Sequence, residues 1–303
     1  MKTVAPAKIN WTLEVLGRRD DGYHEIRSVM QTIDLCDEIS ADRSDEPRFE
    51  TAAGEPLAED DLVVRATRAL EERTGRPLPA RIRVEKRIPV ASGLGGGSSD
   101  AAATLRLLNQ LHGIGLSGED LAEVGAEVGS DVPFFVYGGT ALVEGRGERV
   151  RPLPDVEGAW LSVVVLEAQI SEKTSRMYAR LTQADYTDGL PTDKVTRAVS
   201  SGVDISDDDL FNVFDRHAGA VVEDLDELRE GLFLEVLTPV HVVGSGPAVF
   251  VYCESEPGAR SRAENAAAYA EAFTVGEADI FILQPLARSP ATSVFDVASG
   301  SPR

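Results

Sequence analysis

The chain has 303 residues, enough for two domains of ordinary size. Its 51 acidic and 30 basic residues give a net charge of -21, which would repel a polyanion and argues against a nucleic-acid-binding protein. Only Cys36 and Cys253 are present, and no apolar stretch approaches the roughly 18 residues of a membrane span, so we expect a soluble cytoplasmic protein without a disulfide framework or a Cys/His metal cage.

The apolar pattern predicts strands interleaved with amphipathic helices in both halves of the chain. In the first half we expect a strand at 3–16, a turn at 18–22, a loop or edge strand at 42–60, a helix at 61–75, a strand at 81–85, helices starting near 98 and 117, a turn at 129–135 and a strand at 140–144. In the second half we expect strands at 161–166, 241–243, 248–252 and 279–283, and helices at 173–181, 207–214, 218–232 and 257–273. The prediction is an α+β fold with domains at 1–154 and 155–285, and a flexible tail at 286–303.

A run of glycines and serines, PVASGLGGGSSDAAA at residues 89–103, joins a predicted strand to a predicted helix. It is not a Walker A loop, because no Gly-Lys-Ser/Thr ends it, and it is not G-x-G-x-x-G, because Ser98 stands where the last glycine would be. A glycine-rich turn at a helix N-terminus presents free N–H groups and the positive end of the helix dipole, and Ser98 and Ser99 add hydroxyls. We predict a phosphate site here, against the simpler interpretation of a flexible turn.

Four other short motifs contain candidate site residues, and each has a simpler structural explanation. Lys8 in PAKIN could be a solvated strand residue, and His24 in DGYHE could be an incidental surface residue. Asp131 in GSDVP could cap a helix, and GSGPA at 244–248 could be a tight turn. Taken singly, none of them identifies a function.

In this order and spacing, PAKIN, DGYHE, GLGGGSSDAAA, GSDVPFF and GSGPA resemble the GHMP kinase superfamily over nearly the whole chain, from Thr3 to Leu283. PAKIN with DGYHE is the more specific part, and it resembles the members whose substrate is a methylerythritol alcohol joined to cytidine diphosphate. The resemblance implies an N-terminal domain like ribosomal protein S5 domain 2, a ferredoxin-like C-terminal domain and an active site between them. It also implies phosphoryl transfer from ATP to an alcohol group.

The resemblance also implies roles for the residues at matching positions. Asp131 corresponds to the catalytic aspartate and Lys8 to the active-site lysine. The implied substrate contacts are Asn10, Tyr23, His24, Asp131 and Tyr178, and the implied ATP contacts are Lys86, Pro89, Gly93, Leu94, Gly95, Gly96, Gly97, Ser98 and Ser99. Aromatic rings and a hydrogen-bonding imidazole suit the flat face and polar edge of cytosine.

Some features of the site are predicted from chemistry or depart from the family pattern. Mg²⁺ is expected because bridging phosphates usually need the metal, and Ser99 is the one candidate ligand that the sequence suggests. Trp11 stands where a smaller aliphatic residue is common, which could reshape the substrate pocket, and Asp61 stands where an asparagine often meets the adenine.

Other interpretations of the same motifs stay open. The chain could be a different kinase of the superfamily, acting on mevalonate, phosphomevalonate or homoserine, or a diphosphomevalonate-type decarboxylase. It could also be a non-catalytic nucleotide-binding relative. A monomer and a homodimer are both compatible with the sequence.

Overall fold

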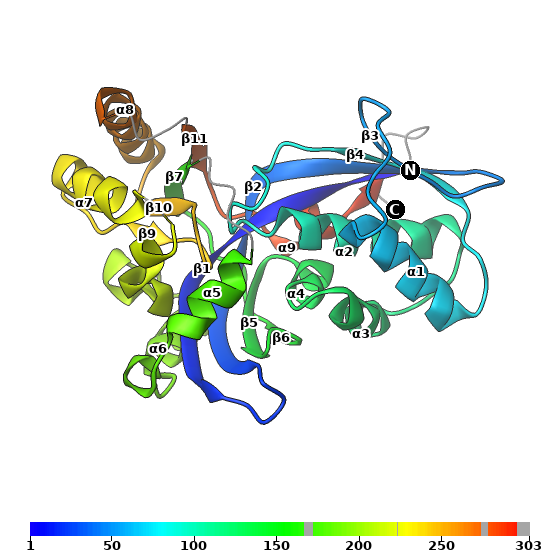
Figure 1. The fold of residues 1–303 in the computed structure, drawn as a ribbon, viewed down its shortest axis with the longest axis horizontal. Helices are drawn as coiled ribbons and strands as arrows, with labels where there is room; N and C mark the ends of the chain where they lie inside the picture. The colour runs from blue at the N-terminus through cyan, green and yellow to red at the C-terminus, as the bar shows by residue number, and fades with distance from the viewer. Residues whose placement is uncertain (167–171, 223, 274–277, 296–303) are drawn as a thin grey trace.

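The structure, a computed structural model, describes residues 1–166, 172–222, 224–273 and 278–295. Two sheets form its framework (Figure 1). The first sheet contains β1 (Lys2–Arg18), β2 (His24–Arg43), β3 (Arg48–Thr51), β4 (Ala80–Glu85), β5 (Thr140–Gly145), β6 (Arg149–Pro152), β8 (Phe211–Asn212) and β12 (Val294–Phe295). The second is antiparallel, in the order β11 (Ala278–Leu283), β7 (Trp160–Leu166), β10 (Val249–Cys253) and β9 (His241–Val242).

Helices cover both sheets, and most fall into two groups at opposite ends of the molecule, while the last helix, α9 (Arg288–Thr292), lies with the first group (Figure 1). The first group is α1 (Leu62–Thr74), α2 (Gly96–Leu111), α3 (Gly118–Val128) and α4 (Val132–Tyr137). The later helices are α5 (Lys173–Arg180), α6 (Leu190–Ser200), α7 (Leu225–Val236), α8 (Glu256–Phe273) and α9 (Arg288–Thr292), with 3₁₀ turns at Gln183–Asp185, Asp207–Asp209, Val213–Arg216 and Ala218–Ala220. None of the described helices is long and apolar enough to cross a membrane.

The long antiparallel pair β1 and β2 positions the N-terminal site residues. Side chains alternate along β1, so Lys8 and Asn10 lie on one face while Ile9 and Trp11 lie on the other. Trp11 is fully buried in a cluster that joins the two sheets, with its ring edge-on to Phe250 at 6.3 Å between centroids. The expectation that Trp11 could reshape the substrate pocket is therefore wrong, because its face of the strand points into the core.

The glycine loop lies between β4 and α2, as the sequence predicts. The Lys8 backbone N–H donates to the Leu94 carbonyl at 2.9 Å, which fastens the loop to β1. The alanine-rich face of α2, including Ala101 and Ala102, is fully buried in the core formed with α1, α3 and the sheet. The loop is thus held by a strand on one side and a buried helix on the other.

Several predicted elements differ from the structure. Residues 207–214 form 3₁₀ turns around β8 instead of a helix, because β8 pairs in parallel with β1. Residues 132–137 form α4 where a turn was predicted. The predicted helix at 218–232 consists of a 3₁₀ turn at Ala218–Ala220 followed by α7, which begins at Leu225. The sequence prediction also missed α6, although its buried Val195 and Val199 have helical spacing.

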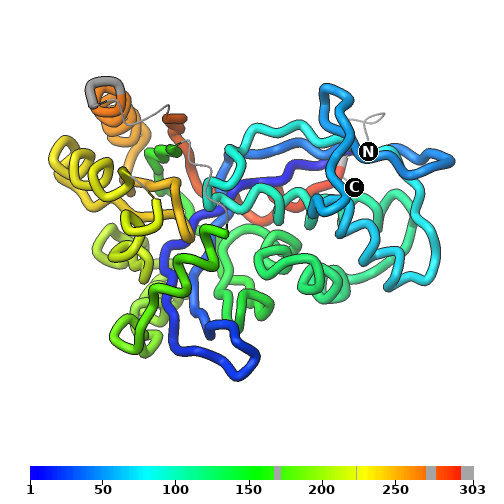
Figure 2. Tube along the Cα trace, viewed as in Figure 1, coloured from blue at the N-terminus to red at the C-terminus, as the bar shows by residue number. Residues whose placement is uncertain are grey.

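The C-terminal segment is partly ordered against the start of the chain. Residues 288–295, within the predicted flexible tail, form α9 and β12, and β12 pairs with β1 (Figure 2). Pairing satisfies backbone groups along the edge of β1, which composition alone does not reveal. Residues 296–303 lie outside the described part of the chain. The division into domains at 154 stays a prediction, and both β8 and β12 join the first sheet from beyond it.

Candidate active site

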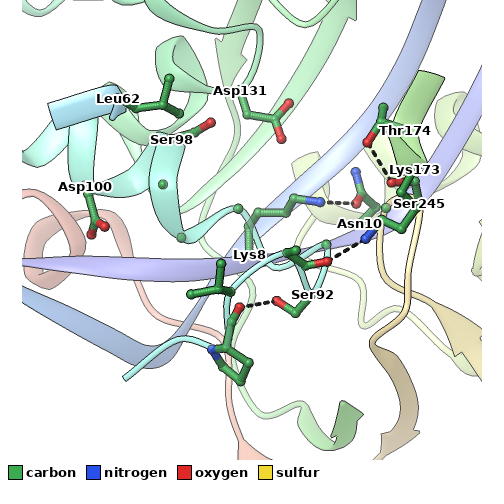
Figure 3. Close-up of a pocket in the computed structure, with 18 of the residues that line it drawn as sticks. Lys8, Asn10, Leu62, Ser92, Ser98, Asp100, Asp131, Lys173, Thr174 and Ser245 are labelled. Carbon is green, nitrogen blue, oxygen red and sulfur yellow. Dashed lines mark hydrogen bonds between the residues drawn. The ribbon is translucent and has the colours of Figure 1, made fainter. Parts of the chain in front are cut away.

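A cleft with a volume of ≈ 670 Å³ lies where β1, the glycine loop, α5 and the turn at Gly244 and Ser245 converge (Figure 3). Most of the predicted site residues line it. These are Lys8, Asn10, Lys86, Pro89, Gly93, Gly95, Gly96, Gly97, Ser98, Asp131 and Tyr178. Leu94 and Ser99 are fully buried beside the cleft, and Tyr23 and His24 lie outside its lining.

The start of α2 provides an anion site on the cleft wall. Gly95 occupies the N-cap position with φ 78 and makes no side-chain cap hydrogen bond. The Ser99 N–H makes the first intrahelical hydrogen bond, to the Gly95 carbonyl at 3.0 Å, so the preceding N–H groups have no intrahelical acceptor. Gly97 and Ser98 therefore present backbone donors and the positive helix end to the cleft.

The glycines of the loop serve different purposes. A Cβ on Gly93, which has φ +94, would lie 2.5 Å from the Val243 carbonyl oxygen, and one on Gly95 would lie 2.8 Å from the Phe135 ring. A Cβ on Gly97 would meet only a Leu62 methyl at 3.4 Å. Gly93 and Gly95 are thus required by the protein's own packing, whereas Gly97 leaves room toward the cleft.

We expect Gly93→Ala to lower the free energy of unfolding by about 1–3 kcal/mol, because the left-handed backbone would be strained and a backbone carbonyl blocks the new methyl. Chemical denaturation measures the change. Gly97→Ala is the matched control and should stay within about 0.5 kcal/mol of the wild type. Equal stability of both variants would show that the loop can move away from Val243.

Asp131 stands immediately before α4, at its N-cap position. Its side chain makes no cap hydrogen bond, although aspartate commonly does so at this place. The carboxylate instead lines the cleft and points toward the space occupied by the Lys8 ammonium (Figure 3). The simpler interpretation of Asp131 as a helix cap is therefore wrong.

The Lys8 ammonium is buried and held by a short chain of hydrogen bonds. Lys8 is 4% exposed, and its Nζ donates to Asn10 Oδ1 at 2.9 Å. Asn10 Nδ2 in turn donates to Ser28 Oγ at 2.9 Å. Burial lowers the pKa of Lys8, and the Asp131 carboxylate opposes this shift. The two candidate catalytic groups are thus electrostatically linked.

Lys86 belongs to a cluster of one ammonium and two carboxylates beneath the glycine loop. Its Nζ donates to Asp100 Oδ2 at 2.7 Å and also to the fully buried Asp37. The other Asp37 oxygen accepts the Ile88 N–H at 2.8 Å. Burial raises the pKa of Asp100 to about 8, and Lys86 opposes that rise. The sequence prediction found Lys86 but missed both acidic partners, which come from β2 and α2.

The cleft also contains residues that the sequence analysis missed. From α5, the Lys173 ammonium donates to the Ala91 carbonyl at 2.7 Å, and Thr174 Oγ1 is hydrogen-bonded to Ser245 Oγ at 3.0 Å (Figure 3). One signal was present in the sequence. Lysine is scarce in this chain, and three of its five lysines, Lys8, Lys86 and Lys173, line this single cleft.

The predicted aromatic set is only partly brought together. Tyr178 lines the cleft, the His24 ring stacks on it at 5.0 Å with an interplanar angle of 23°, and Phe214 meets it edge-on at 5.0 Å. Burial, and secondarily Arg18, lowers the pKa of His24. Tyr23 is 51% exposed, and the Arg146 guanidinium carbon lies 5.3 Å from its ring centroid.

Asp61 has a local structural role and also lines the cleft. Its Oδ1 accepts the Val63 N–H at 2.8 Å and so caps α1. Aspartate and asparagine can both cap a helix at this position, so the structure explains why Asp61 can stand where the family often has asparagine.

Known proteins share both the sequence and the fold. Residues 61–139 match the model of the family described as GHMP kinases N terminal domain. A 4-diphosphocytidyl-2-C-methyl-D-erythritol kinase of Dehalococcoides mccartyi is 40% identical over 248 residues, which cover 82% of this chain and 87% of the relative. The chain belongs to the family of 4-diphosphocytidyl-2-C-methyl-D-erythritol kinases.

Further comparisons agree with this family of kinases. A 4-diphosphocytidyl-2-C-methyl-D-erythritol kinase of Listeria monocytogenes is 38% identical over 257 residues, covering 81% of this chain and 84% of the relative. A crystal structure of 4-(cytidine 5'-diphospho)-2C-methyl-D-erythritol kinase has a TM-score of 0.75 at 30% identity, covering 94% of this chain and 100% of that chain. The predicted two-domain α+β GHMP kinase fold is confirmed.

Proposed function

We propose that this kinase transfers the γ-phosphoryl group of ATP to the 2-hydroxyl of 4-diphosphocytidyl-2-C-methyl-D-erythritol, in the non-mevalonate pathway to isoprenoid precursors. The observation that carries the proposal is the Asp131 carboxylate. It makes no helix-cap hydrogen bond and shares the cleft with the buried Lys8 ammonium and the N-terminus of α2. Identity of 40% with a relative of that name supports the choice of substrate.

The proposed reaction uses the chain's groups mainly for positioning and charge. The 2-hydroxyl oxygen forms a bond to the γ-phosphorus, the bond from that phosphorus to the ADP oxygen breaks, and Asp131 accepts the hydroxyl proton. Because the transition state of phosphoryl transfer is loose, the proton can be taken late and an ordinary carboxylate suffices. Lys8 orients the Asp131 carboxylate by its charge and offsets charge on the phosphoryl group, while Asn10 holds the ammonium in place.

The donor groups in the cleft fit a Mg²⁺ ion that is held largely by phosphates. No group of three or more His, Cys, Asp or Glu that could hold a metal occurs among the described residues. The Ser98 hydroxyl lines the cleft, whereas Ser99 is fully buried, so Ser98 is the better candidate to contact the ion. Such sparse protein ligation is typical of Mg²⁺ bound with nucleotide phosphates and water. The ion would neutralise charge on the bridging phosphate oxygens.

The aromatic contacts favour a substrate that carries a base. Tyr178 and Phe214 line the cleft with their rings in edge-on contact, the His24 ring stacks on Tyr178 from outside the lining, and rings of this kind stack on nucleobases. Mevalonate and homoserine contain no flat ring, so these contacts would have no purpose in the alternative kinases. We place the cytidine end of the substrate here and the ATP phosphates at the start of α2.

ADP release by the purified protein tests the proposal. With 4-diphosphocytidyl-2-C-methyl-D-erythritol and Mg²⁺ we expect turnover that a chelator abolishes, and we expect none with mevalonate or homoserine. Turnover with another alcohol alone would refute the substrate assignment but leave the assignment to the superfamily standing.

Tyr178→Ala should raise KM for the cytidyl substrate about tenfold or more, as loss of one stacking contact costs roughly 1–3 kcal/mol.

A further inference from the structure

Lys173 is a cation in the cleft that the proposed reaction has not yet used. It is the first residue of α5, and its Nζ donates to the backbone carbonyls of Ala91 and Gly246. Ala91 lies in the loop that leads to α2, and Gly246 lies in the turn after β9. The ammonium is therefore at the meeting point of α5 and the two loops that form the phosphate end of the cleft (Figure 3).

In the part of the chain that the structure describes, the hydrogen-bond acceptors of Lys173 are neutral, as is that of Lys8, whereas the other three lysines bond to carboxylates. Lys86 bonds to two carboxylates, while Lys2 and Lys194 form surface ion pairs with Glu38 and Asp209. The chain has a net charge of -21, yet among the described residues the hydrogen-bond acceptors of the Lys173 ammonium are both backbone carbonyls. Burial, and secondarily repulsion by Lys8, lowers the pKa of Lys173 to about 8.

We infer that Lys173 is a further phosphate-contacting residue, whose ammonium exchanges one carbonyl for an oxygen of the terminal phosphates of ATP. The inference rests on the proposed function. Hydrogen bonds from an ammonium to phosphate are charge-assisted and stronger than those to a neutral carbonyl, so the exchange is favourable. A phosphate bound there would also offset the repulsion between Lys173 and Lys8 that the structure already shows.

The exchange has a proton-linked consequence. A phosphate beside Lys173 raises its pKa, so nucleotide binding near pH 8 should draw a proton onto the ammonium. Other groups in the cleft also respond to the phosphate charge, and Asp100 titrates in the same range. The titratable and charged groups that line the cleft with Lys173 are Lys8 on β1, Asp61 before α1, Lys86 after β4, Asp100 on α2, Asp131 before α4, and Glu172 and Tyr178 at α5. The informative quantity is therefore the difference between the wild type and a Lys173 variant.

Calorimetry in two buffers of different ionisation enthalpy measures that difference. With ADP and with a non-hydrolysable ATP analogue, each with Mg²⁺ at pH 8, we expect the wild type to take up roughly half a proton more than Lys173→Met. The variant should also lose about 10- to 100-fold in kcat/KM for ATP, since a charge-assisted contact is worth roughly one to two factors of ten. Lys173→Arg should recover part of this loss. Lys194→Met removes an exposed lysine and should match the wild type.

The possible outcomes separate the explanations. Unchanged kcat/KM in Lys173→Met would overturn the inference. Equal proton uptake in the wild type and Lys173→Met, together with a lower melting temperature of the variant, would also overturn it, because Lys173 would then only join the two loops. A wild type that takes up the extra proton on nucleotide binding but does not turn over the cytidyl substrate would refute the proposed function and leave the phosphate contact in place.

Discussion

Asp131→Asn is expected to lower kcat with the cytidyl substrate by a factor on the order of 10² to 10⁴, about 3–5 kcal/mol of barrier. The amide keeps the size of the side chain but is a poor proton acceptor and carries no negative charge to attract the Lys8 ammonium. The carboxylate makes no helix-cap bond, so the fold should not depend on it. Steady-state ADP release at saturating substrates measures the effect, and the melting temperature reports on the fold.

A matched control separates the role of this carboxylate from the chemical change itself. Asp188→Asn makes the same change at a residue outside the cleft, where Oδ1 accepts the Leu190 N–H at 3.1 Å before α6. We expect near-normal turnover from it, since asparagine supports the same local hydrogen bond. Near-normal turnover of Asp131→Asn as well would remove Asp131 from the reaction.

The parts of the site that the sequence revealed are those formed by local structure. The glycine loop was predictable because an alternating strand before it and an apolar helical pattern after it fix its conformation over about 20 residues. Lys8 and Asn10 were predicted through the resemblance of PAKIN to the family's motif, and the structure places both on one face because residues two apart on a strand share a face. Asp131 was predicted through the same resemblance, because its local sequence suits a helix cap equally well, and the observed side-chain direction argues against the cap.

The parts that the sequence did not reveal depend on contacts between distant segments. Asp37 reaches Lys86 across 49 residues, and Lys173 reaches Gly246 across 73 residues, so no local pattern signals either contact. Trp11 was misjudged for a related reason. Its strand face is buried by the second sheet, whose packing partner Phe250 lies far along the chain. Polar clusters between layers are therefore visible only once the layers are assembled.

The acidity of the chain makes the lysines of the cleft more informative. Screening limits the reach of the surface charge to roughly 8 Å at physiological salt, so a few cations with free N–H groups can bind an anion locally. Lys8, Lys86 and Lys173 supply those cations, and α2 supplies the N–H groups. The fully buried Asp37 carboxylate offsets the charge of Lys86, whereas the buried Lys8 ammonium is coupled electrostatically to the proposed base, Asp131.

Lys8→Met is expected to lower kcat/KM for the cytidyl substrate by a factor on the order of 10² to 10³, because methionine keeps the apolar stem but removes the charge that balances the transferring group. Stability should change little. Removing a buried ammonium relieves its desolvation, whereas Asn10 Oδ1 loses its donor at a cost of roughly 1–3 kcal/mol. Chemical denaturation measures that balance beside the kinetics.

Combining Lys8→Met with Asp131→Asn tests whether the two groups act together. If Lys8 works by orienting the Asp131 carboxylate, its removal matters little once the carboxylate is gone. We then expect the kcat/KM of the double variant to be at most about tenfold below that of the less active single variant. This loss is far smaller than the product of the two single losses. A fully multiplicative loss in kcat/KM would mean that Lys8 contacts the phosphates independently and that its coupling to Asp131 has no part in the reaction.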